Sequence, residues 1–144
     1  MMGKTYQSIV VKAPAEKIWN ALRNFHDLSW APDVISDVDV VGEKKGDQPG
    51  AKRVLNGAFH ETLHVLDDDN RELTYSIDDG PSPISHEEIS NYEGHVRVRS
   101  VTEGNGGTFV EWYSNWTGND EAAAEFCHDI YAGLLGQLKK TFER

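Results

Sequence analysis

Apolar residues near the C-terminus recur with the period of an α-helix from Glu121 to Phe142. At about 100° per residue they fall in one broad arc, made of Phe126, Cys127, Ile130, Tyr131, Leu134, Leu135, Leu138 and Phe142. Charged residues fill the opposite arc. The pattern predicts a long surface helix whose wide apolar face needs a concave apolar partner. We expect Gly118, Asn119 and Asp120 to cap its start.

Alternating patterns predict strands through most of the chain before this helix, at residues 6–11, 34–41, 51–55, 58–66, 73–77, 88–102 and 108–117. Asn56-Gly57 is a strong signal for a hairpin turn. With a turn of two residues, Leu55 would face Ala58 and Lys52 would face Glu61. Two short helices, 15–23 and 26–30, are expected between the first two strands. Pro14 suits the start of the first, and Pro32 follows the end of the second.

Strands followed by a long helix indicate an α+β fold with one antiparallel sheet. Such a sheet of seven strands would twist and curl, and the apolar face of the last helix would fill its concave side. Because the chain has 144 residues, we expect one domain, 1–144.

The net charge of −10 argues against non-specific binding to nucleic acid or to anionic membranes. The N-terminus has no apolar stretch typical of a signal peptide, and no segment approaches the length of a membrane span. Cys127 has no second cysteine to pair with, so nothing argues for an oxidising compartment. We therefore expect a cytoplasmic protein without stable membrane insertion.

Short sequences along the chain resemble those of a known family in their order and spacing. They are 14–19 (PAEKIW), 30–32 (WAP), 50–53 (GAKR), 61–63 (ETL), 73–75 (LTY), Gly80-Pro81 with Asn91-Tyr92, and 110–112 (VEW). In these features the sequence resembles the polyketide cyclase/dehydratase-like family of the START-related helix-grip superfamily (SRPBCC). The resemblance implies a helix-grip fold with an apolar cavity between sheet and helix, used across the superfamily for lipids, polyketides and other hydrophobic molecules.

Strand parity indicates which residues would face that cavity. Burying two indoles is more favourable than burying Glu111 and Asn115, so we expect the face of the last strand that carries Trp112, Ser114 and Trp116 to point inward. The small groups of Gly94, Ser114 and Gly133 favour open space there, although a filled core remains an alternative. The candidate ligand-binding residues are Trp30, Tyr75, Tyr92, Val96, Trp112, Ser114, Trp116, Phe126, Ile130 and Leu134.

Glu61 is the candidate catalytic residue. Its neighbours at period two, Phe59, Leu63 and Val65, would all point inward and place the carboxylate on the apolar face. Partial desolvation would raise its pKa and suit it to general acid or base chemistry, or to binding a ligand hydroxyl. The structural alternative is an ion pair with Lys52 or Arg53.

No metal or cofactor is expected, because His60 and His64 lack further ligands at a suitable spacing and 67–70 lacks features of a calcium loop. Three functions are left open. The first is a carrier that binds a small apolar molecule, and the second is a cyclase or dehydratase in which Glu61 moves protons. The third is a protein-interaction module with an exposed apolar patch. A homodimer is also left open.

Overall fold

The computed structural model describes residues 2–104, 106–118 and 121–143. Its elements are β1 (Met2–Val11), α1 (Ala15–Leu22), β2 (Val38–Val41), β3 (Lys52–Leu55), β4 (Phe59–Asp67), β5 (Glu72–Asp79), β6 (Ser90–Ser100), β7 (Thr108–Thr117) and α2 (Glu121–Phe142). The strands form one seven-stranded antiparallel sheet in the order β1-β7-β6-β5-β4-β3-β2. This confirms the predicted α+β class and is consistent with a helix-grip fold.

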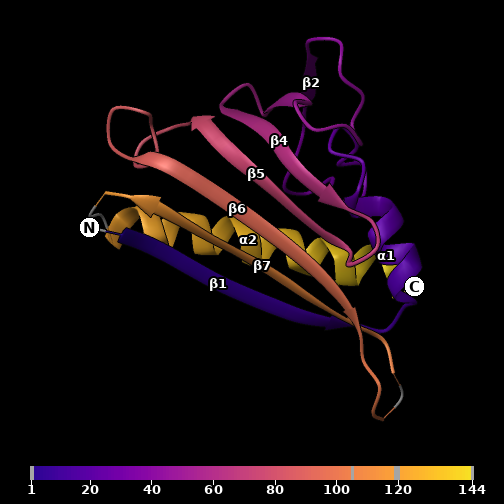
Figure 1. Ribbon diagram of the computed structural model, residues 1–144. Coiled ribbons are helices and arrows are strands. Elements are labelled where there is room, and N and C mark those ends of the chain that lie inside the picture. Colours follow the sequence, from indigo (N-terminus) through magenta and orange to yellow (C-terminus); the bar gives the residue numbers. More distant parts are fainter. Residues whose placement is uncertain (1, 105, 119–120, 144) are drawn as a thin grey trace.

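Helix α2 lies lengthwise against one face of the curved sheet (Figure 1). It packs on β1 and β7, which are neighbours because the N-terminal strand pairs with the last one. The centre of the predicted apolar arc is buried, and Phe126, Ile130 and Phe142 lie half-buried along its edges. The predicted caps Asn119 and Asp120 lie outside the described residues. Neither helix of the described chain is long and apolar enough to cross a membrane.

The predicted second short helix, 26–30, is wrong, because turns connect α1 to β2. Two side chains instead accept from the backbone two residues further on: Oδ1 of Asn24 accepts from the His26 amide at 3.1 Å, and Oδ1 of Asp27 accepts from the Ser29 amide at 2.9 Å. Such local bonds compete with helix formation. The loop also takes up residues 34–37, so β2 begins later than expected.

The predicted register of the hairpin is also wrong by one residue. Asn56 and Gly57 do adopt left-handed conformations, with φ of 54° and 64°, and the Ala58 amide bonds to the Leu55 carbonyl at 3.0 Å. The ladder, however, begins one residue later, with Leu55 opposite Phe59. As a result Arg53, and not Lys52, lies opposite Glu61.

The inward faces of β5, β6 and β7 are as predicted, with Leu73, Tyr75, Tyr92, Val96, Val98, Val110, Trp112, Ser114 and Trp116 all buried. Strand β4 departs from the prediction at Val65, whose side chain is 51% exposed. A register shift between Leu63 and Val65 places Leu66 opposite Leu73 instead. The bulge turns Val65 outward and lets half-buried Leu66 pack against the core.

The glycines do not mark open space as expected. A Cβ on Gly94 would lie 2.3 Å from Cζ of Tyr75, so the tyrosine ring already fills the position that the missing side chain leaves free. A Cβ on Gly133 would make an ordinary contact with Val34 at 3.4 Å, and one on Gly136 would meet no atom within 4 Å. No described residue therefore packs so closely against α2 that position 136 has to be glycine.

Gly136→Ala should consequently stabilise the protein. Alanine is favoured over glycine by about 1 kcal/mol inside a helix, and the new methyl group would face solvent. Urea denaturation followed by circular dichroism should show a gain of about that size. A loss of stability would reveal a packing constraint on this face of α2.

Candidate functional site

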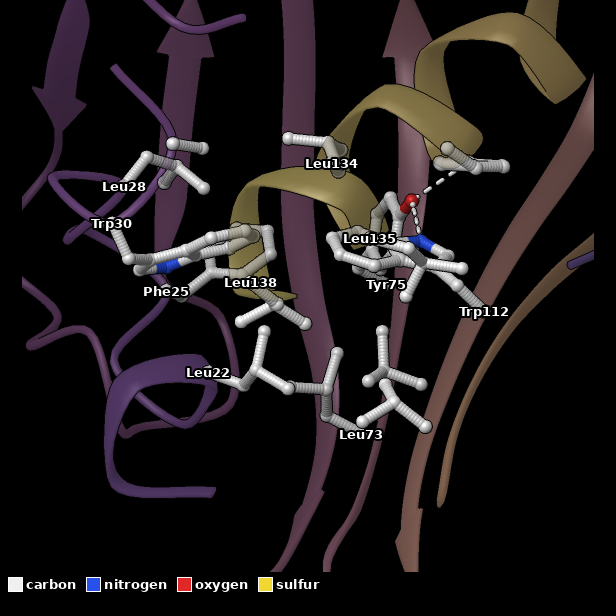
Figure 2. Packing of buried hydrophobic residues seen from close by; sticks show 14 of the residues in the cluster. Leu22, Phe25, Leu28, Trp30, Leu73, Tyr75, Trp112, Leu134, Leu135 and Leu138 are labelled. Atoms are coloured by element: carbon white, nitrogen blue, oxygen red, sulfur yellow. Dashed lines mark hydrogen bonds between the residues drawn. The ribbon is translucent and has the colours of Figure 1, made fainter. Parts of the chain in front are cut away.

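A small cavity lies between α2, the inner side of β3–β5 and the loop before β2. Its volume is about 90 Å³, and most of its walls are apolar. The lining residues are Leu28, Val34, Ile35, Arg53, Leu55, Asn56, Phe59, Glu61, Tyr75, Ile77, Ile84, Trp112, Cys127, Ile130, Tyr131 and Leu134. Figure 2 shows three of these close together, Leu134 on α2 above Tyr75 and Trp112 on the strands. The sequence places the cavity here because α2 covers β1 and β7 and leaves the inner face of β4 and β5 to the loops.

An ion pair between Arg53 and Glu61 lies at the sheet side of the cavity. Both side chains are only 6% exposed. Nε of Arg53 donates to Oε1 of Glu61 at 2.8 Å, and its NH2 lies 2.7 Å from the same oxygen. NH1 donates to the Phe25 carbonyl at 2.8 Å, and the guanidinium lies 3.7 Å from the centre of the Phe25 ring. Arg53 therefore joins the hairpin to the loop after α1.

The environment of Glu61 acts on its pKa in two directions. Burial raises the pKa above the ordinary value of 4.5, and the negative charge of Asp78 adds to this. The charge and hydrogen bond of Arg53 oppose the rise. The net direction is upward, so this carboxyl group holds a proton more tightly than an exposed glutamate does.

Three tyrosine hydroxyls form a buried chain next to this pair. The Tyr131 hydroxyl on α2 bonds to that of Tyr75 at 2.7 Å and to that of Tyr92. Nε1 of Trp112 donates to the Tyr75 hydroxyl at 3.0 Å, a bond drawn in Figure 2. Burial raises the pKa of all three tyrosines well above 10, so they stay neutral and serve as hydrogen-bonding groups.

The loop between α1 and β2 closes the cavity and is held from two sides. From the hairpin, Asn56 Nδ2 donates to the Val34 carbonyl at 3.1 Å. From α2, Gln137 Oε1 accepts from the Asp33 amide at 3.0 Å, and Thr141 Oγ1 donates to the Trp30 carbonyl at 2.8 Å. Polar contacts of this kind fix a segment that has no regular structure of its own.

Two half-buried phenylalanines lie at and beside the cavity. Phe59 lines the cavity, and Phe126 stacks on it from α2 with ring centres 6.2 Å apart. Because they are half-buried, these rings can move with less loss of packing than the buried rings of Tyr75, Trp112 and Tyr131.

The structure brings together five of the candidate site residues at this cavity: Glu61, Tyr75, Trp112, Ile130 and Leu134. Tyr92 reaches it only through the hydroxyl of Tyr131. Trp30 and Val96 lie beside Trp112 near a minor void of about 10 Å³, and Phe126 stands behind Phe59. Ser114 and Trp116 lie elsewhere, since Ser114 bonds to Thr5 on β1 and the Trp116 ring covers Gly3.

Sequence reasoning gave Arg53 only as an ion-pair partner and left out Tyr131, Cys127 and Ile84 as cavity residues. Tyr131 and Cys127 belong to the predicted apolar arc of α2, but periodicity could not tell which part of that arc meets a void. Burial raises the pKa of the Cys127 thiol to about 11, which keeps it protonated and unreactive. Ile84 comes from an irregular segment without a periodic signal.

The described residues contain no group of three or more side chains that could hold a metal ion. His64 bonds to Ser76 at 2.7 Å, and His60 is exposed on the outer face of the sheet. In the acidic turn, Asp68 accepts hydrogen bonds from Trp19 and Arg23, each at 2.8 Å, and so fastens the turn to α1.

The segment that carries Ile84 is anchored by an exposed pair, Asp79 and His86. Oδ1 of Asp79 accepts from the amides of Gly80 and His86 at 2.9 and 3.0 Å and lies 2.9 Å from Nδ1 of His86. The His86 hydrogen bonds lower the pKa of Asp79 to about 2, and the same contact raises the pKa of His86 above 6.5.

This anchor should depend on pH. It is complete while Asp79 is ionised and His86 is protonated; it is lost as the pH falls through about 2, or rises through the raised pKa of His86. We expect slower amide hydrogen exchange across 80–89, corrected for intrinsic rates, at about pH 5 than at about pH 8. Asp79→Asn should abolish the difference and lower the pKa of His86 in an NMR titration. An unchanged His86 titration in that variant would contradict the anchor.

The sequence pattern of one family, described as polyketide cyclase/dehydrase and lipid transport, matches residues 2–143. The chain belongs to the polyketide cyclase/dehydrase and lipid transport family. Membership suggests a ligand-binding or cyclase role without naming the ligand. No protein with a curated description matches the sequence.

Solved structures agree with membership of the polyketide cyclase/dehydrase and lipid transport family. A protein of Nitrosospira multiformis is similar to this chain with a TM-score of 0.93 and 44% identity, over 97% of this chain and 96% of that one. XoxI of Bacillus cereus has a TM-score of 0.78 and 28% identity, over 97% and 95% of the two chains. An uncharacterized protein of Bacillus thuringiensis has a TM-score of 0.77 and 27% identity, over 99% and 100%.

Proposed function

We propose that this protein binds a small, largely apolar molecule in the cavity between α2 and strands β3–β5. The observation that carries the proposal is the combination of apolar walls with one buried ion pair and one tyrosine chain. Ligand sites in proteins commonly have this composition, in which a few polar groups orient a mainly apolar molecule.

The size of the cavity constrains the ligand. Pockets for drug-sized molecules hold roughly 300–1,000 Å³, so a space of about 90 Å³ admits only a small group unless its walls move. The half-buried Phe59 and Phe126 are the rings whose displacement would enlarge it. We therefore propose that a small ring or short chain binds inside and that any larger part of the ligand extends past these phenylalanines.

Native mass spectrometry of the protein purified from its own cells, with organic extraction of bound material, tests the proposal. We expect a stoichiometric apolar small molecule, and adding it back at about 100 times its Kd should stabilise the apo protein by about 2.7 kcal/mol. A clean apo mass together with no thermal shift across a panel of aromatic and aliphatic ligands would overturn the proposal in favour of a filled core.

A matched pair of variants assigns binding to this cavity. Ile130→Trp places an indole where a half-buried residue lines the cavity, and it should abolish binding while the far-ultraviolet circular dichroism stays unchanged. Val10→Trp adds the same group on β1 at a position that is 45% exposed, and it should bind normally. Equal binding by both variants would place the ligand elsewhere.

A second function, acid–base catalysis by Glu61, has one specific observation in its favour. The carboxyl group is buried, has a raised pKa and lines the same cavity as Tyr75. For a substrate identified by extraction, Glu61→Gln should then reduce turnover by about 10²–10⁴-fold, a much larger change than the change in affinity. Unchanged turnover in the folded variant would exclude proton transfer by Glu61 and leave only the carrier role.

A further inference from the structure

Few polar atoms line the cavity, so their remaining hydrogen-bond capacity decides which polar group a ligand can carry. Each donor nitrogen already has at least one partner. Nε and NH2 of Arg53 face Glu61, and NH1 donates to the Phe25 carbonyl. Nε1 of Trp112 donates to Tyr75, and Nδ2 of Asn56 donates to the Val34 carbonyl.

The tyrosine hydroxyls also have partners. Two of their three protons are used in the bonds that join Tyr75, Tyr131 and Tyr92. Ser114 and Cys127 also contact the hydroxyl of Tyr92, at the other end of the chain from Tyr75. The Tyr75 oxygen already accepts from Trp112. The Tyr75 hydroxyl makes two hydrogen bonds and can make one more, so it is a neutral group that a ligand could engage beside Glu61.

Glu61 differs from these groups. Arg53 approaches only Oε1, and none of the described residues donates a hydrogen bond to Oε2. A carboxylate oxygen accepts hydrogen bonds and donates none. Because no described protein group satisfies this acceptor, a ligand group that donates a hydrogen bond to it would be bound with a substantial preference.

Charge limits the ligand further. The single positive group of the cavity, Arg53, is paired with Glu61, and the negative charge of Asp78 acts on the same carboxylate. A carboxylate or phosphate on the ligand would lie against Oε2 and be repelled. A neutral donor meets no such penalty.

The walls suit a flat ring. Phe59, Tyr75, Trp112 and Tyr131 all contribute to the lining. An apolar cavity of about 150 Å³ holds benzene in another protein, so the present one needs only a modest displacement of its half-buried wall to take a single ring.

We propose that the ligand is a neutral molecule with one ring in the cavity and a hydroxyl group, as in a phenol, that donates a hydrogen bond to Oε2 of Glu61. This inference rests on the proposed function, because it concerns the same cavity. It assigns Glu61 as the specificity-determining residue, which selects hydroxyl compounds over ethers and over anions of the same shape.

Three probes with the same methylated ring test the selection: p-cresol, 4-methylanisole and p-toluate, titrated at neutral pH and followed by NMR shifts of the cavity residues. We expect p-cresol to bind at least about tenfold more tightly than either of the others, the size of effect given by one hydrogen bond to a charged group. In the double variant R53M/E61L, which keeps the site filled with apolar groups, the preference over 4-methylanisole should fall to within about twofold.

The outcomes are distinct. Equal affinity for p-cresol and 4-methylanisole, or tightest binding of p-toluate, would overturn the inference and leave the proposed function standing. A p-cresol preference that survives in the folded double variant would assign selection to the tyrosine hydroxyls and overturn it as well. No shifts with any probe up to about 10 mM would overturn the inference, since a single ring would then not enter the cavity, and the extraction experiment decides the proposed function separately.

Discussion

Replacing Arg53 with methionine is expected to reduce the free energy of unfolding by about 3–5 kcal/mol. The substitution leaves the Glu61 carboxylate buried without a counter-charge and removes the hydrogen bond to the Phe25 carbonyl. Urea denaturation at neutral pH, followed by tryptophan fluorescence, measures the loss. In a protein of this length the melting temperature should fall by about 10 °C or more.

The loss should be smaller in acid. Burial already raises the pKa of Glu61, and without Arg53 nothing opposes that rise. A group whose pKa is higher in the folded than in the unfolded state favours folding below its unfolded value, and this advantage disappears as the pH rises through the folded value. The variant should therefore approach the wild type in stability near pH 4 and diverge from it above about pH 5.

A double variant separates the charge effect from a simple loss of packing. Replacing both partners, as in R53M/E61L, should recover most of the stability lost in R53M, because an apolar pair of similar volume often equals a buried ion pair. If R53M costs less than about 1 kcal/mol at neutral pH, the pair is not desolvated as described. If the double variant is as unstable as R53M, packing around the arginine stem and Phe25 accounts for the loss.

Much of this site could be predicted from the sequence. Alternation along β5, β6 and β7 placed Tyr75, Tyr92 and Trp112 on the inner face, since moving a single strand by one residue would expose indoles and bury charges. The same argument put Glu61 inside, and Arg53 was one of its two expected partners. Periodicity works well where one face of an element is fully buried.

What could not be predicted depends on side chains that bond to nearby backbone. Asn24 and Asp27 turn the expected second helix into a loop, and Asn56 holds residues 34–37 away from the sheet. The extra residue Ala58 in the hairpin decides that Glu61 faces Arg53 and not Lys52. Each of these depends on a few local contacts, which leave no periodic pattern in the sequence.

The volume of the cavity could not be predicted from the sequence either. Gly94 and Ser114 suggested empty space, yet the Tyr75 ring lies over Gly94 and Ser114 is bonded to Thr5. A small residue in a strand can mark either a void or the close approach of a large neighbour. Only the packing of several elements together decides between them.

Gly94→Ala is accordingly expected to destabilise the protein by about 1–3 kcal/mol, the usual cost of overpacking a core. The added Cβ would lie 2.3 Å from Cζ and 2.6 Å from the hydroxyl oxygen of Tyr75. That ring is 1% exposed and packs 6.0 Å from the ring of Phe25, so it has no free space to enter except the cavity. Displacement toward the cavity would break the bonds of Tyr75 to Tyr131 and Trp112 and reduce ligand binding as well as stability.

A double-mutant cycle with Tyr75→Leu tests that cause. If the clash with the ring is responsible, G94A should cost much less in the Y75L background, giving a coupling energy of about 1 kcal/mol or more. Gly133→Ala is the control for glycine replacement near the same cavity, because its Cβ would only touch Val34 at 3.4 Å. It should be neutral or slightly stabilising in urea denaturation. Additive effects of G94A and Y75L would mean that the backbone of β6 requires glycine at position 94, and that the space needed by the Tyr75 ring does not.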